Sequence, residues 1–67
     1  MQIGSKKELV VMLMNRDHIS ALEAKRMVAI TQQLINEVVE DGGSLDDVEE
    51  ILSEHLGLEL DYIFLFI

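Results

Sequence analysis

Hydrophobic positions recur with helical spacing in three stretches of the chain. The first predicts a helix over residues 6–16, with Leu9, Val10, Leu13 and Met14 on its inner side. The second predicts a helix over residues 21–40. The third predicts a helix over residues 45–56, whose inward residues are Val48, Ile51, Leu52 and Leu56. The chain has no proline, and the pattern is typical of a small all-α bundle forming a single domain over residues 1–67.

A serine precedes each of these stretches, and an acidic residue stands three positions after each serine. The pairs are Ser5 with Glu8, Ser20 with Glu23, and Ser44 with Asp47. In a capping box the serine hydroxyl accepts a hydrogen bond from the backbone N–H of the third residue. The acid of that residue reaches back to the N–H of the serine. The three motifs are therefore predicted to be helix starts.

Glycines predict where the second and third helices end. Residues 41–43, DGG, and then Gly57 follow the two helices, and glycine adopts the left-handed conformation of a helix end without strain. The apolar residues 62–67 come next and suit a strand. A lone strand has no partner in a helical chain, so we expect a short fourth helix over 61–66, capped by Asp61.

The apolar stripe of the second helix is wider than one neighbouring helix covers, which predicts a homodimer. The stripe comprises Ala24, Met27, Val28, Ile30, Thr31, Leu34, Ile35, Val38 and Val39, roughly half the circumference. A chain of 67 residues with 49% hydrophobic residues and no cysteine also favours self-association. The aromatic tail is expected to pack across the dimer. The predicted dimer or partner interface is Val28, Thr31, Ile35, Val38, Tyr62, Ile63, Phe64 and Phe66.

Charge is distributed unevenly along the chain. The five basic residues and three of the thirteen acids lie in residues 1–26, which gives +2 there and −10 over residues 27–67. An acidic face is predicted on the third helix, at Asp46, Asp47, Glu49, Glu50 and Glu54. Such a surface repels nucleic-acid phosphates, so direct nucleic-acid binding is not expected. It favours solubility, or a partner with a basic or apolar groove.

Residues 5–42 resemble the N-terminal helical hairpin of the HU/IHF family of bacterial DNA-bending proteins. The likeness lies in the KKEL opening, the IS turn, the EAKR that follows and the long second helix ending in DG. In that family the hairpin builds an intertwined homodimer, and the resemblance implies the same here. The family's β-sheet and basic arms should follow, but this chain continues with an acidic helix and an apolar tail. The resemblance therefore implies the dimer and not DNA binding.

The segment GGSLDDVEEIL resembles the part of acyl carrier proteins in which a serine of an Asp-Ser-Leu motif receives phosphopantetheine. The resemblance implies Ser44 as the attachment site. However, Gly43 stands where that family has aspartate, and only 23 residues follow Ser44. The whole chain is also similar to short, acidic, uncharacterised proteins of Gram-positive bacteria and their prophages, in its SKKEL start and LGLELDYIF ending.

The residue pattern does not predict an enzyme, a cofactor or a metal site. Catalysis needs convergent polar groups in a pocket, whereas the acids lie on predicted solvent faces and His18 and His55 lack ligand spacing. No run approaches the ~20 apolar residues of a membrane span, and no signal peptide is recognised. A cytoplasmic location without membrane contact is expected.

The sequence thus predicts a small acidic protein–protein interaction or regulatory module, related to phages or mobile elements, whose first partner is itself. One alternative is a polyanionic inhibitor that mimics nucleic acid, with the third helix as the phosphate mimic. A second alternative is a degenerate carrier protein modified at Ser44.

Overall fold

Four helical elements make up the protein in a computed structural model, which describes residues 3–67. They are α1 (Lys6–Asp17), α2 (Ala21–Glu40), α3 (Leu45–Leu56) and the 3₁₀ helix η1 (Leu60–Leu65). The all-α prediction is confirmed, since residues 3–67 contain no strand. The bounds of α2 and α3 agree with the sequence prediction, and α1 continues to Asp17. The tail is helical, as expected.

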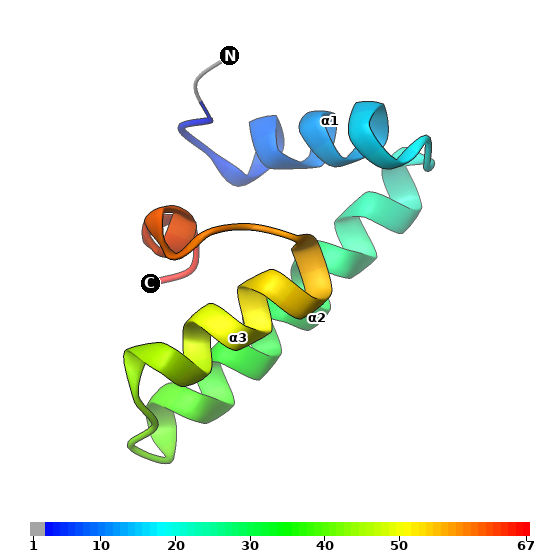
Figure 1. Ribbon diagram of the computed structural model, residues 1–67. Coiled ribbons are helices and arrows are strands. Elements are labelled where there is room, and N and C mark those ends of the chain that lie inside the picture. Colours follow the sequence, from blue (N-terminus) through cyan, green and yellow to red (C-terminus); the bar gives the residue numbers. More distant parts are fainter. Residues whose placement is uncertain (1–2) are drawn as a thin grey trace.

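The long helix α2 supports the other elements (Figure 1). It packs against α1 near its own start and against α3 along its second half. Because a tight turn joins α2 to α3, these two helices run side by side in opposite directions. The short η1 packs against α3. In Figure 1 it lies beneath the start of α1, so the tail returns to the N-terminal region.

All three serines cap helices, as predicted. The Ser5, Ser20 and Ser44 hydroxyl oxygens accept hydrogen bonds from the backbone N–H groups of the third residues at 3.2, 3.1 and 3.4 Å. The reciprocal bond is present at Ser44, where Asp47 Oδ2 accepts from the Ser44 N–H at 3.1 Å. Because both halves are formed there, α3 has a complete capping box.

Left-handed residues end the three α-helices. Gly42 has φ +76° after α2, and Gly57 has φ +64° after α3, as the glycine pattern predicts. His18 ends α1 with φ 54° and ψ 47°, a conformation that is unusual for a residue with a Cβ atom. The prediction that Asp61 caps the fourth helix is wrong. The N-cap of η1 is Glu59, without a side-chain hydrogen bond, and Asp61 lies inside the first turn.

The core lies where α1, α2, α3 and the tail meet. Its only buried polar side chain among residues 3–67 is Thr31, whose hydroxyl donates to the Met27 carbonyl at 2.8 Å. Not all of the predicted stripe on α2 is inside, because Ile30 and Val39 are 53% and 56% exposed. The buried hydrophobic residues are Ile3, Leu9, Leu13, Ala24, Val28, Ile35, Val48, Leu52, Leu56, Leu58 and Phe66.

The tail contributes to the core of its own chain, whereas the sequence predicts that it packs across a dimer. Phe66 is 4% exposed. Its carbonyl accepts a hydrogen bond from Gln32 Nε2 at 2.8 Å, and the Lys6 ammonium lies 5.5 Å from its ring centroid. The tail reaches the core because Gly57 redirects the chain after α3. Phe64 and Ile67 stay outside, 53% and 76% exposed.

The surface area is that of a chain that closes its own core. It is 4500 Å², and a folded monomer of this mass has about 4300 Å². An intertwined subunit would expose more surface when it is taken alone. The single chain therefore buries its core residues without a second copy.

Candidate functional site: a lysine-rimmed groove

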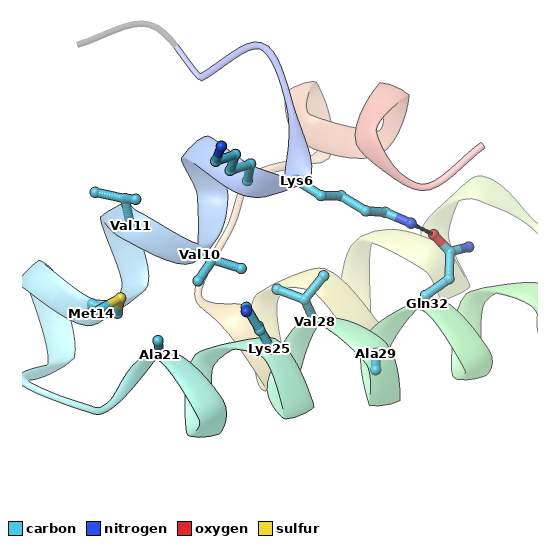
Figure 2. A pocket seen from close by; sticks show the side chains of 10 residues that line it. Lys6, Val10, Val11, Met14, Ala21, Lys25, Val28, Ala29 and Gln32 are labelled. Atoms are coloured by element: carbon cyan, nitrogen blue, oxygen red, sulfur yellow. Dashed lines mark hydrogen bonds between the residues drawn. The ribbon is translucent and has the colours of Figure 1, made fainter.

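An open groove of about 790 Å³ runs between α1 and α2 (Figure 2). Helix α1 contributes Lys6, Lys7, Val10, Val11 and Met14. Helix α2 contributes Ala21, Lys25, Val28, Ala29 and Gln32. We call this surface the lysine-rimmed groove, because lysines are the charged residues in an otherwise mostly apolar lining.

The groove arises from the way in which α1 and α2 pack. Helix α1 buries Leu9 and Leu13 in the core, and helix α2 buries Ala24 and Val28. The next side chains around α1, Val10 and Met14, are only half-buried, so they form a wall instead of closing the gap. On α2, the lining residues Ala21 and Ala29 are too small to fill the space (Figure 2).

Three of the five basic residues of the chain surround this groove. The Lys6 ammonium donates a hydrogen bond to Gln32 Oε1 and covers the Phe66 ring. Lys7 and Lys25 are exposed. Within residues 3–67 the single ion pair joins Arg16 and Asp17, so Lys7 and Lys25 are available for an acidic partner.

Gln32 closes one end of the groove by joining it to the tail. Its Oε1 accepts from Lys6, while Nε2 donates to the Phe66 carbonyl and to Asn36 Oδ1, both at 2.8 Å. In Figure 2 the tail passes beyond Lys6 and Gln32. The groove and the tail are therefore neighbouring parts of one surface.

The outward side of the tail carries an acid and two apolar side chains at intervals of three residues. Asp61, Phe64 and Ile67 are all exposed. A 3₁₀ helix has three residues per turn, so Asp61 and Phe64 lie one above the other on η1. We call these three residues the tail edge. Its composition complements that of the groove.

The predicted acidic face is present on α3. All five of its residues, Asp46, Asp47, Glu49, Glu50 and Glu54, are exposed. Four of them and Ser53 line a shallow hollow of about 440 Å³. Across residues 3–67, no cluster of three or more acidic, histidine or cysteine side chains is arranged to hold a metal ion. The face therefore presents charge without a coordination site.

The residues of the predicted dimer interface do not share one surface. Val28, Thr31, Ile35 and Phe66 are buried in the chain's own core, and Val38, Tyr62 and Ile63 are half-buried. Of that set, Phe64 alone is exposed. The sequence interpretation did not single out Lys25 and Ala29 as site residues. Their spacing of four on α2, repeated by Lys7 and Val11 on α1, was the available signal.

The Arg16–Asp17 pair lies at the other end of α1. Arg16 Nε and Nη2 donate to the two carboxylate oxygens of Asp17, each at 2.8 Å. This hydrogen bonding, with the attraction between the charges, lowers the pKa of Asp17 and raises the pKa of Arg16. The Arg16 guanidinium also lies against Gly57. The pair therefore marks the place where α1 meets the end of α3, outside the groove.

Comparison of the chain with protein-family models, with curated proteins and with solved structures finds no match. The resemblance to the HU/IHF hairpin therefore stays a prediction. None of the helices formed by residues 3–67 combines the length and the apolar character needed to cross a membrane.

Proposed function

We propose that the protein is a small acidic protein–protein interaction module that works as a homodimer. The observation that carries the proposal is the lysine-rimmed groove, an apolar surface that its own chain leaves open. Open apolar grooves in small proteins are typical of binding sites for a segment of another protein. With lysines around it, the groove favours a segment that carries both apolar and acidic residues.

A second copy of the chain is the nearest source of such a segment. The chain has thirteen acidic residues against five basic ones, and ten of the acids follow residue 36. Three of the five cations surround the groove. Opposite charges on two parts of one chain favour association between copies, because the basic part of one copy attracts the acidic part of the other.

Sedimentation velocity over a protein concentration series tests the proposal. We expect a reversible shift from about 7.6 kDa to twice that mass as the concentration rises through the micromolar range. Circular dichroism should show that the helical content is the same at both ends of the series. A single species of monomer mass at every concentration would refute the homodimer.

A second candidate function is the binding of a basic protein by the acidic face. It is favoured by the five exposed carboxylates on α3, none of which forms an ion pair within residues 3–67. A protein that mimics nucleic acid binds through such charges, and its affinity falls steeply with salt. Titration with a lysine-rich peptide tests it. The variant Glu50→Lys should weaken binding, and Lys25→Glu, in the groove, should not.

The geometry of Ser44 supports a helix cap as its role. Its hydroxyl accepts the Asp47 N–H, and its own N–H donates to the Asp47 carboxylate. Incubation with a phosphopantetheinyl transferase and its cofactor, followed by mass spectrometry, tests the carrier alternative. An unchanged mass is expected.

A further inference from the structure

We propose that the tail edge of one copy docks in the lysine-rimmed groove of a second copy, and that the two copies exchange this contact reciprocally. The inference rests on the homodimer proposed above and names the surfaces that build it. Phe64 and Ile67 would lie on the floor of the partner's groove, with Asp61 beside its lysines.

The groove and the tail edge complement each other. The groove presents apolar side chains between Lys7 and Lys25. The tail edge presents two exposed apolar side chains preceded by one acid. Each surface on its own leaves apolar area in water, and their contact removes both areas from water together.

A chain cannot place its tail edge in its own groove. Lys6 and Gln32 hold Phe66 at the end of the groove, through the cation–ring contact and the 2.8 Å hydrogen bond to its carbonyl. With Phe66 buried, Phe64 and Ile67 remain 53% and 76% exposed. Another copy has to supply the tail edge that enters the groove.

The groove and the tail edge are neighbours on the surface of the chain. Lys6 and Gln32 line the groove and also contact Phe66, which lies between Phe64 and Ile67 in the sequence. A two-fold interface needs one self-complementary patch, in which each element meets its counterpart on the partner. An axis through this junction gives both copies the same contact. The acidic face of α3 fits the groove less well, because its five carboxylates are accompanied on that helix by one largely exposed apolar side chain, Leu45.

Charge exchange between the two surfaces tests the inference. Lys25→Glu and Asp61→Lys should each weaken the dimer about five- to tenfold, because each places like charges together. The double variant Lys25→Glu/Asp61→Lys should recover an affinity within about threefold of the parent protein, since the pair is restored with its signs reversed. Sedimentation equilibrium gives the dissociation constants.

Two matched controls lie outside both surfaces. Arg26→Glu makes the same charge change as Lys25→Glu at the next residue of α2, which does not line the groove. Glu50→Lys matches Asp61→Lys but lies on the acidic face of α3. We expect both to change the dissociation constant less than about twofold, as is usual for charges outside an interface.

The apolar part of the contact is tested by Phe64→Ser, which should weaken the dimer by about 30-fold or more if Phe64 is a central anchor. Because Phe64 is half exposed in the single chain, the monomer should keep its helical content. Isotope-filtered NMR on a mixture of labelled and unlabelled protein should show contacts between the Phe64 ring and the methyl groups of Val11 and Ala29. If the Lys25→Glu and Phe64→Ser variants dimerise with the dissociation constant of the parent protein, this inference is overturned. The proposal of a homodimer is then still supported. A protein that is monomeric throughout overturns both.

Discussion

Gln32 Nε2 donates a hydrogen bond to the Phe66 carbonyl at 2.8 Å, across 34 positions of the chain. The same side-chain amide accepts from Lys6, so one residue on α2 holds both the start of α1 and the tail. Replacing Gln32 with alanine removes both bonds. We expect the free energy of unfolding to fall by about 1–2 kcal/mol.

Urea denaturation followed by circular dichroism measures this loss. Gln33→Ala is the matched control, because Gln33 is exposed at the neighbouring position of α2. Its midpoint should stay close to that of the parent protein. Equal midpoints for the two variants would show that the contacts of Gln32 do not anchor the tail.

The two phenylalanines of the tail should differ sharply in their effect on the monomer. Phe66 is 4% exposed and Phe64 is 53% exposed. Phe66→Ala should cost about 3–5 kcal/mol, the usual loss when a buried phenylalanine is removed. Phe64→Ala should cost much less at a protein concentration where the chain is monomeric. Thermal melts of both variants, in parallel at low concentration, compare them. Comparable losses would mean that the tail packs differently.

The serine caps should contribute unequally. Ser20→Ala removes an acceptor that bonds Glu23 N–H at 3.1 Å and should cost about 0.5–2 kcal/mol. Ser44→Ala should cost at least as much, because α3 has the complete capping box. Ser53→Ala, an exposed site inside α3, serves as control and should have no cost, since alanine favours helix. Chemical denaturation ranks the three. If the cost at Ser44 is as small as at Ser53, the box does not stabilise α3.

Glycine positions 42 and 43 should respond differently to alanine. Gly42 has φ +76° and open space around it, so Gly42→Ala should cost about 1–2 kcal/mol through its left-handed backbone alone. At Gly43 an added Cβ would overlap Val38 Cγ1 and lie 3.0 Å from the Val38 carbonyl oxygen. Gly43→Ala should therefore destabilise more than Gly42→Ala. Adding Val38→Ala should reduce the excess. Midpoints of urea unfolding for the single and double variants decide the order.

Salt should stabilise the monomer. The ten acids after residue 36 have no basic residue among them in the sequence, and like charges on the acidic face repel one another. Raising the ionic strength from about 0.01 M to about 0.15 M shortens the screening distance from about 30 Å to about 8 Å. The melting temperature at low protein concentration should rise with that change. A fall would show that ion pairs dominate the surface.

Acid should remove the contribution of the Arg16–Asp17 pair. Hydrogen bonds from Arg16 hold the pKa of Asp17 below its usual value of 3.8. A depressed carboxyl pKa stabilises the fold above the unfolded-state value, and that stabilisation is lost as the pH falls through the folded-state value. The parent protein should therefore exceed Asp17→Asn in stability at neutral pH, and the gap should close below the folded-state pKa. Melting curves across the acid range test this, and a gap that persists there would contradict it.

Local signals are sufficient to predict the helices, because caps and glycines act within a few residues. Ser20 and Gly42 bracket α2, and Ser44 and Gly57 bracket α3, so these bounds follow from neighbouring atoms. The interior location of Phe66 depends instead on Gln32 and Lys6, far away in sequence. Periodicity separates the apolar side of a helix from its polar side, but it does not assign an apolar residue to a core or to a dimer.

The candidate site was less predictable for the same reason. Whether Val10 closes the core or lines a groove depends on how α1 crosses α2 and on the small size of Ala29. The position of Thr31 on the wide stripe predicts an interface residue. In the single chain this side chain is buried, and its hydroxyl donates to the Met27 carbonyl of the same helix. The acidic face was predictable, because five charged residues on one side of α3 stay in solvent unless a partner charge pairs with them.

The single ammonium group of Lys6 belongs to a residue that lines the groove, and it also lies over the Phe66 ring. A carboxylate that draws this ammonium away from Gln32 and Phe66 releases part of the hold on the tail. Thermodynamic reciprocity then requires that a loosened tail changes the affinity for that carboxylate by the same free energy. If the groove binds such a carboxylate, its occupancy and the anchoring of the tail become linked equilibria, and binding between α1 and α2 is then transmitted through one side chain to the last residues of the chain.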